Sequence, residues 1–335
     1  MNASEAAKNA LQFVLEGKED ESIVIFCDDV KAEIGEAFKK GAEDLKLQTK
    51  LVILKTSTDI FRTEIPKHLM KYLTTQRPDI YVNILSGIRE ETPFRIKLIH
   101  HQTQDHKTRL GHCPGISLDM LTQGALAWTA EEHRQMQSFA EALIEKLKDA
   151  VKIKIRNAAG TNISLSVNNR SFFTDTRIDW KLMKWMNLPT GEVIVAPVED
   201  SLEGKLVCDM AIGGIGPVKK PVTIKAKHGV VISVTCEDKE HLRNVQNSLH
   251  VDEKAKVVGE FAFGINPKAR FVEEFLEERQ HLFVAFFLSQ FRVDLVGRPF
   301  HGIHSIHRAE INPDNVGKSD VELLDTPLFH KIRSL

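Results

Sequence analysis

Two glutamates stand inside apolar, strand-like runs in the second half of the chain. Glu192 lies in residues 187–197 (NLPTGEVIVAP) and Glu260 lies in residues 257–264 (VVGEFAFG), each directly after a glycine. An ionised carboxylate is costly to bury unless a cation, hydrogen bonds or water receive it. The repeated pattern predicts that both acids belong to one polar site.

The two-residue period of a strand predicts which residues share a face with these glutamates. Because alternate side chains of a strand share a face, Glu192 is expected beside Ile194 and Ala196, and Glu260 beside Val258 and Ala262. Each acid is then the one charge on its face. A glutamate at the start of a strand is also often simply solvated, and this alternative stays open for each acid taken alone.

Further acids and histidines lie nearer the C-terminus. Glu277 and His281 precede the apolar run 282–287, and His301, His304 and His307 follow at intervals of three residues. The flanking glycine and prolines favour an extended segment, in which His301 and His307 share a face and His304 points away. Carboxylates and neutral imidazoles from separate strands are typical ligands of zinc, cobalt, manganese or iron. A packed or rim histidine remains the alternative for His281 taken alone, and a polar loop remains the alternative for His301 and His304.

The first 150 residues alternate between apolar runs and helical patterns. Strands are predicted at 22–27, 50–54 and 79–85, and helices at 31–46, 64–75 and 131–150. Fully apolar strands separated by helices predict a doubly wound α/β domain, residues 1–150, with a parallel sheet covered on both faces. No Gly-x-Gly-x-x-Gly pattern follows the first strand, so no dinucleotide site is expected there.

After residue 150 the pattern changes to strict alternation of apolar and polar residues. Residues 151–155 and 163–167 alternate on either side of a turn, which predicts a hairpin. Further strands are predicted at 206–210, 222–226, 230–236 and 282–287. We therefore expect a β-rich α+β domain, residues 151–335, that carries the site.

Composition excludes several classes of partner. The chain has 335 residues with 45 Lys and Arg against 46 Asp and Glu, so no net field favours nucleic acid or an anionic membrane. No apolar stretch approaches the ~18 residues of a membrane span and no leader pattern is present, which predicts a cytoplasmic protein. The four cysteines stand singly, as reduced structural thiols do.

Several of these stretches occur together in a known family. They are NLPTGEVIVAP, the following EDSLEG (199–204), AGTNIS (159–164), GEFAFGINP (259–267) and His281-Leu282. On these motifs the chain resembles the thermophilic aminopeptidase family, also called leucyl aminopeptidase T or M29, over most of residues 151–310. The resemblance implies a dimeric, cytoplasmic metallopeptidase that uses two zinc, cobalt or manganese ions to remove N-terminal amino acids from peptides.

The resemblance also implies a ligand set. By position, Glu192 and Glu260 match the family's two strand carboxylates, with Glu260 as the bridge between cations. His281 and His307 match its imidazole ligands, and Glu277 matches an acid shortly before the first histidine. No further catalytic residue is assigned.

Two departures bear on activity. The family's His-x-Asp pattern is replaced by His307-Arg308-Ala309, and Glu310 comes one residue too late unless a bulge re-aims it. The family also has a tyrosine soon after its first histidine, whereas both tyrosines of this chain lie before residue 82. Loss of a metal carboxylate predicts altered or lost peptidase activity.

Two alternatives remain beside the peptidase. The same scaffold resembles 2,5-dihydroxypyridine 5,6-dioxygenase, which holds one iron with two histidines and an aspartate. Glu260 and Ala309 stand at two of those positions here, so only His307 would remain. The third alternative is a non-catalytic binding protein on the same fold. A peptide or a small molecule is the expected substrate.

Overall fold

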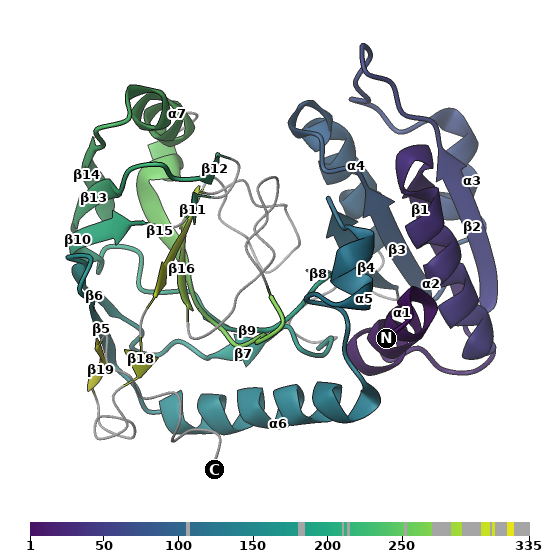
Figure 1. Ribbon diagram of the computed structural model, residues 1–335, viewed down its shortest axis with the longest axis horizontal. Helices are drawn as coiled ribbons and strands as arrows, with labels where there is room; N and C mark the ends of the chain where they lie inside the picture. The colour runs from purple at the N-terminus through teal and green to yellow at the C-terminus, as the bar shows by residue number, and fades with distance from the viewer. Residues whose placement is uncertain are drawn as a thin grey trace.

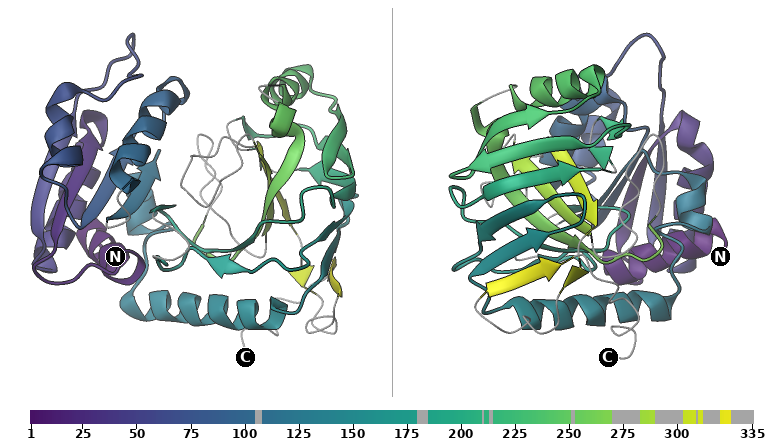
Figure 2. Two further views of the ribbon diagram at one scale, coloured as in Figure 1. Left: turned by 180° about the vertical axis from the view of Figure 1, so that it is seen from behind. Right: turned by 60° about the vertical axis from the view of Figure 1, so that its left-hand side comes forward.

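The computed structural model describes residues 1–104, 108–179, 185–209, 211–212, 215–250, 253–269, 283–289, 303–308, 310–311 and 320–324, the last four ranges by their backbone alone. Figure 1 shows a helix-covered sheet beside a larger, curved sheet, with one long helix running beneath the larger one. Seen from behind, the two sheets form the arms of a U (Figure 2, left).

The smaller sheet is parallel, as predicted. Its strands are β1 (Ser22–Asp28), β2 (Gln48–Leu54), β3 (Ile80–Leu85), β4 (Arg109–Pro114) and β8 (Trp185–Asn187), in the order β2-β1-β3-β4-β8. β1 and β3 consist largely of β-branched and aromatic residues and are buried almost throughout, as central strands of a parallel sheet must be. Two strands were not predicted. Arg109 and His112 interrupt the apolar run of β4, and the short β8 comes from beyond residue 150.

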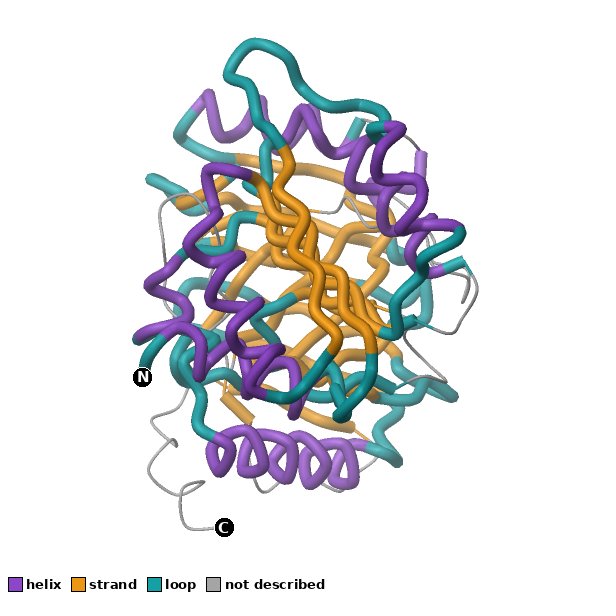
Figure 3. The backbone as a smooth tube through the Cα atoms, turned by 90° about the vertical axis from the view of Figure 1, so that its right-hand side faces the viewer, coloured by secondary structure: helices purple, strands orange, loops and turns teal. Residues whose placement is uncertain are grey.

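Helices cover both faces of this sheet. α1 (Ala3–Asn9), α2 (Ala32–Asp44) and α5 (Leu118–Thr122) pack on one face, and α3 (Met70–Thr74) and α4 (Thr92–Thr103) pack on the other. Figure 3 shows the strands edge-on between these two groups of helices. The helix predicted at 64–75 begins later because Pro66 is extended and only a 3-10 turn, Lys67–Leu69, precedes α3. α4 was not predicted because Gln102 and Thr103 are buried despite their polarity.

The long helix α6 (Ala130–Leu147) confirms the prediction for residues 131–150. It begins at a capping box in which Thr129 and Glu132 exchange hydrogen bonds with each other's backbone, and this arrangement satisfies N–H groups that a helix start leaves open. Its buried residues Ala140, Leu143 and Leu147 pack into the core of the larger sheet. No helix among the described residues has the length and apolarity needed to cross a membrane.

The larger sheet is built mainly from antiparallel pairs. Its strand order is β12-β11-β17-β16-β15-β14-β13-β10-β6-β5-β19-β18, and β9 pairs with β15 and β7. The bounds are β5 (Lys152–Arg156), β6 (Asn162–Ser166), β7 (Phe173–Thr174), β9 (Glu192–Val195), β10 (Glu203–Cys208), β11 (Ala211–Ile212), β12 (Gly216–Pro217), β13 (Val222–Lys227), β14 (Val230–Thr235), β15 (Val257–Gly264), β16 (Phe283–Ser289), β17 (Ile303–Arg308), β18 (Glu310–Ile311) and β19 (Asp320–Leu324). Each strand predicted after residue 150 is present. Between β14 and β15 lies α7 (Lys239–Leu249), capped by Asp238.

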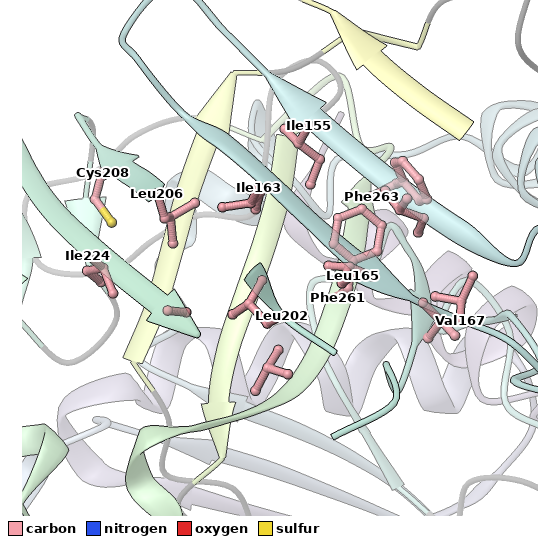
Figure 4. Close-up of a cluster of buried hydrophobic side chains, with 14 of the residues drawn as sticks. Ile155, Ile163, Leu165, Val167, Leu202, Leu206, Cys208, Ile224, Phe261 and Phe263 are labelled. Atoms are coloured by element: carbon pink, nitrogen blue, oxygen red, sulfur yellow. The ribbon is translucent and has the colours of Figure 1, made fainter. Parts of the chain in front are cut away.

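Alternate residues of these strands form one core. Ile155, Ile163, Leu165, Leu206, Phe261 and Phe263 point into it from four strands (Figure 4). The residues that alternate with them on β5 and β6 face outwards and are polar or charged. All four cysteines are free thiols. The structure confirms an α/β part followed by a β-rich part, while a division into domains at residue 150 remains a prediction.

Candidate functional site

Glu192 is the first residue of β9, and the loop before it is shaped by Gly191. Gly191 has φ 134°, and a Cβ atom at this position would lie 2.5 Å from the Cβ of Asn266. Only glycine fits such a backbone this close to another side chain. The Leu188–Pro189 peptide bond in the same loop is cis. The loop before Glu192 therefore packs directly on the loop after β15.

Two side chains of the β7 segment hold the backbone of Glu192. Asp175 Oδ1 accepts hydrogen bonds from the backbone N–H of Gly191 at 2.9 Å and of Glu192 at 2.7 Å. Thr174 donates its hydroxyl to the carbonyl of Glu192 at 2.7 Å. Asp175 and Glu192 are both buried, at 6% exposure each. A buried carboxylate that accepts two N–H bonds fixes the direction in which β9 begins.

Asn266 connects this loop to the segment between α5 and α6. Its amide Nδ2 donates to the carbonyl oxygens of Thr190 at 2.8 Å and Ala125 at 2.9 Å, and the residue is fully buried. Lys268 donates to the carbonyl of Ala127 and pairs with Glu132 of α6 at 2.8 Å. Asn266 and Lys268 therefore join the loop before Glu192, the segment between α5 and α6, and the first turn of α6.

Glu192 and Glu260 lie on the same face of two neighbouring strands. β9 and β15 are antiparallel, with Glu192 opposite Gly264 and Ile194 opposite Ala262. Ile194 and Ala262 pack together in a cluster on the face away from the main core. Glu192 and Glu260 are each two residues from a member of this pair, so both belong to that face.

One expectation about this face was wrong. Glu260 was expected beside both Val258 and Ala262, but Val258 is buried in the main core while Ala262 lies in the opposite cluster. The register against β16 shifts between Val258 and Glu260, as a β-bulge does. The extra residue turns the strand, so the strict alternation expected from the sequence fails at this point.

The two carboxylates share a face without being adjacent. Glu260 lies four positions along β15 from Gly264, the partner of Glu192, which corresponds to ~13 Å at the usual rise of a strand. Among the described residues, no three His, Cys, Asp or Glu side chains converge as a ready metal-binding group. Two ions ~3.5–4 Å apart, as in two-metal sites, would bridge a larger part of the distance between the two carboxylates than a single ion.

The charges of this face repel one another. Burial, and then the negative charge of Asp175, raise the pKa of Glu260 to about 8. Such a shift means that the ionised form lacks sufficient compensation. A divalent cation compensates carboxylates directly, and oxygen ligands of this type suit zinc, cobalt and manganese. Oxygen ligands for a cation are therefore present on this face, with Asp175 as a third acid beside the predicted two, but the described residues do not form a converging metal-binding group.

The remaining predicted ligands are described in part or not at all. Glu277, His281 and His301 lie outside the described residues. His307 lies in β17, whose extended backbone agrees with the prediction for this segment. In register, His307 stands opposite Val284 of β16, whereas His304 stands opposite Phe287, the partner of Glu260. The row of residues that contains Glu260 therefore contains His304.

Glu310 does not continue the β16–β17 ladder. It begins β18, where it pairs with Leu324 of β19. The position after Arg308 in the family pattern, Ala309, lies outside the described residues. The register thus gives no support for Glu310 as a substitute for the family's aspartate.

Asp175 and Asn266 are functional candidates that the sequence interpretation missed. Asn266 stands in the quoted GINP motif, where the proline after it signals a turn that needs a capping side chain. Asp175 stands in a polar stretch, FTDTR, with no strand-like pattern around it. In the sequence it appears only as a single acid directly after two phenylalanines and a threonine. This pattern is a weak indication of a functional residue.

Part of the chain matches a family model. The model described as Thermophilic metalloprotease (M29) matches residues 122–274. This segment contains Asp175, Glu192, Glu260 and Asn266, and it ends before Glu277. The resemblance seen in the sequence motifs is thereby confirmed for the segment that holds the two strand carboxylates. Among curated protein sequences, none matches the chain significantly.

Two solved structures share the whole fold. The 2,5-dihydroxypyridine dioxygenase of Pseudomonas putida KT2440 is 18% identical, with a TM-score of 0.64 over 91% of this chain and 90% of that one. Wild-type AmpT of Thermus thermophilus is 13% identical, with a TM-score of 0.64 over 92% of each chain. At these identities the comparisons establish the fold alone.

Proposed function

We propose that this chain is a divergent, metal-dependent hydrolase of the aminopeptidase type. The observation that carries the proposal is the position of Glu192 and Glu260 on one face of β9 and β15, inside the segment that matches the M29 family. The proposed ligands of two zinc, cobalt or manganese ions are Glu192, Glu260, Glu277, His281 and His307. Such ions supply Lewis acidity and a water of lowered pKa for attack on the first peptide carbonyl.

The protein's own groups have separate tasks in this proposal. Glu192 presents its carboxylate from a strand whose start is fixed by Asp175 and Thr174. Glu260 supplies the second carboxylate, and its raised pKa favours cation binding once the proton has left. The family's aspartate and tyrosine have no counterpart at Ala309 or after His281. We therefore expect slow turnover, with metal binding better retained than catalysis.

Metal binding and catalysis can be tested separately. Isothermal titration with zinc, cobalt or manganese measures affinity for the wild type, Glu192→Gln and Glu260→Gln. Release of amino acid from leucyl and other aminoacyl reporters measures turnover. Glu33→Gln, which changes an exposed acid of α2, is the matched control. The proposal expects each site variant to weaken metal binding about tenfold or more and the control to have no effect.

Folded wild-type protein that releases no amino acid with any of the three metals would contradict the peptidase proposal. If it also binds none of them, the third alternative is favoured, a binding protein that kept the fold.

The second candidate function is a mononuclear iron, ring-cleaving enzyme. It is favoured by the similarity to the dioxygenase, which covers 91% of this chain. One iron per chain together with oxygen-dependent consumption of 2,5-dihydroxypyridine would support it. Two zinc or cobalt ions per chain would support the peptidase instead.

The resemblance to the family also leads us to propose a homodimer in the cytoplasm. Sedimentation velocity of purified protein measures the oligomeric state. The sedimentation coefficient of a 37.8 kDa monomer at micromolar concentration would contradict the homodimer. Cell fractionation measures the location.

A further inference from the structure

The outward face of the larger sheet carries a row of positive charges. Arg156, Lys205 and Lys225 stand in one line across β5, β6, β10 and β13, because Arg156 is opposite Asn162, Asn162 is opposite Lys205, and Lys205 is opposite Lys225. Lys227 lies two residues further along β13, and all four cations are exposed. We call these four residues the basic strand face. Figure 2 (right) shows the strands that carry it side by side.

This row is not required by the fold. The residues that alternate with these cations, such as Leu206 and Ile224, fill the core on the other side of the sheet. Lys205 and Lys225 are directly opposed on neighbouring strands, a placement in which like charges destabilise the sheet. Any polar residue would serve as well on a solvated face. A bound anion would relieve the repulsion expected between two lysines placed in this way.

The surface around these cations is a shallow, open hollow. The basic strand face lines an open depression of about 690 Å³ together with Asn157 and Gly160. A Cβ atom at Gly160 would come within 3.3 Å of the Lys205 Nζ, so the ammonium group reaches over the hairpin turn. Among the described residues that line the depression, the acid is Glu203, whose Oε1 accepts from the backbone N–H of His228 at 2.7 Å and pairs with its ring at 3.1 Å. Its charge is directed to that turn.

The spacing of the cations points to an extended ligand. From β5 to β13 there are three strand intervals, or ~14 Å at the usual strand separation. A single phosphate group does not span this distance. In an extended polypeptide, carboxylates at positions i, i+2 and i+4 share one side and cover ~13 Å, which matches the row.

The lining distinguishes a polypeptide from a nucleic acid. Single-stranded nucleic acids are held by basic grooves with aromatic side chains for base stacking. The described residues that line the depression include no aromatic side chain and instead include Ile232, which is 62% exposed. The whole chain has a net charge of −1, so no long-range field attracts a polynucleotide.

We propose that the basic strand face binds an extended acidic segment of a polypeptide. The main hydrophobic core separates this face from Glu192 and Glu260, whose side chains lie on the far face of β9 and β15. The proposal is therefore independent of the metal site and of its chemistry. It adds a second binding surface, which recognises a partner or a substrate by its carboxylates.

Fluorescence anisotropy tests the proposal. A labelled peptide of alternating glutamate and serine is titrated with full-length protein in a chelator, so that metal binding cannot contribute. We expect Lys205→Gln/Lys225→Gln to bind about tenfold more weakly than wild type, with a smaller dependence on salt. Lys50→Gln/Lys239→Gln removes the same charge from exposed positions elsewhere and should bind like wild type.

Three results would overturn the proposal. The first is equal affinity of the two double variants. The second is equal binding of a glutamine-serine peptide, and the third is tighter binding of an oligothymidylate than of the acidic peptide. A thermal unfolding scan of each variant shows that it is folded; if the Lys205/Lys225 variant is not, Lys227→Gln replaces it, with the same expected direction.

Discussion

Replacing Asn266 by alanine removes the side chain that joins the Glu192 loop to the segment between α5 and α6. Asn266 is fully buried, and its amide donates to the carbonyls of Thr190 and Ala125 while its Oδ1 accepts from the N–H of Lys268 at 3.0 Å. Each such bond contributes about 1 kcal/mol, and a buried carbonyl left without a donor costs more. We expect the free energy of unfolding to fall by about 3 kcal/mol.

The assay is urea unfolding followed by circular dichroism, with Asn168→Ala, an exposed asparagine, as the control. Asn266→Asp keeps the acceptor but replaces the donating amide by a carboxylate that faces two carbonyl oxygens, so we expect a loss at least as large. The same variants should weaken metal binding, because the Thr190 side of the Glu192 loop is released. A loss below about 1 kcal/mol for both Asn266 variants would refute the claim that this residue fixes the loop.

Three further perturbations follow from buried charges and rings. His133 is almost fully buried, and burial lowers its pKa to about 4 from 6.5. Because the unfolded chain takes up the proton first as the pH falls, the free energy of unfolding should be highest above pH 6.5 and decrease towards pH 4 by up to ~3 kcal/mol. The variant His133→Phe should reduce this pH dependence. Arg62 forms ion pairs with the buried Asp28 and Glu91, so Arg62→Gln should lower the free energy of unfolding by about 3–5 kcal/mol in urea titrations. Asp175→Asn keeps an oxygen that can accept both N–H bonds and should change stability by less than about 1 kcal/mol, whereas Asp175→Ala should cost about 2 kcal/mol.

Each of these three has a result that contradicts it. For His133, the contradiction is an unchanged slope of stability against pH between 6.5 and 4 in the phenylalanine variant. For Arg62, it is wild-type stability after the charge has been removed. For Asp175, it is an asparagine variant as unstable as the alanine variant, which would mean that the negative charge and not the acceptor oxygen holds the loop.

The sequence was sufficient for elements whose residues are either uniformly apolar or strictly alternating. β1 and β3 are buried on both sides and β5 and β6 on one, so composition and period identify them without further information. β4 was missed because Arg109 is buried, where it pairs with Glu21 and donates to the carbonyls of residues 15 and 16, all more than 80 positions away in the chain. Such partners leave no trace in the local pattern.

The site was also predicted only in part. The two glutamates were identified from their apolar surroundings, and they do share a face. The face of Val258 was wrong because a bulge before Glu260 cannot be seen in a strand period. The roles of Asp175 and Asn266 depend on contacts across 16 and 141 residues, so they could be recognised only after the fold had brought those segments together.

An anomalous difference map at the zinc edge, from a crystal of the full chain soaked with zinc, shows whether Glu192 and Glu260 hold a metal ion. We expect one or two peaks between the carboxylates of Glu192 and Glu260, within coordination distance of at least one oxygen of each, and none at this place in Glu192→Gln/Glu260→Gln crystals. Peaks confined to other parts of the molecule, with both carboxylates unliganded, would contradict it.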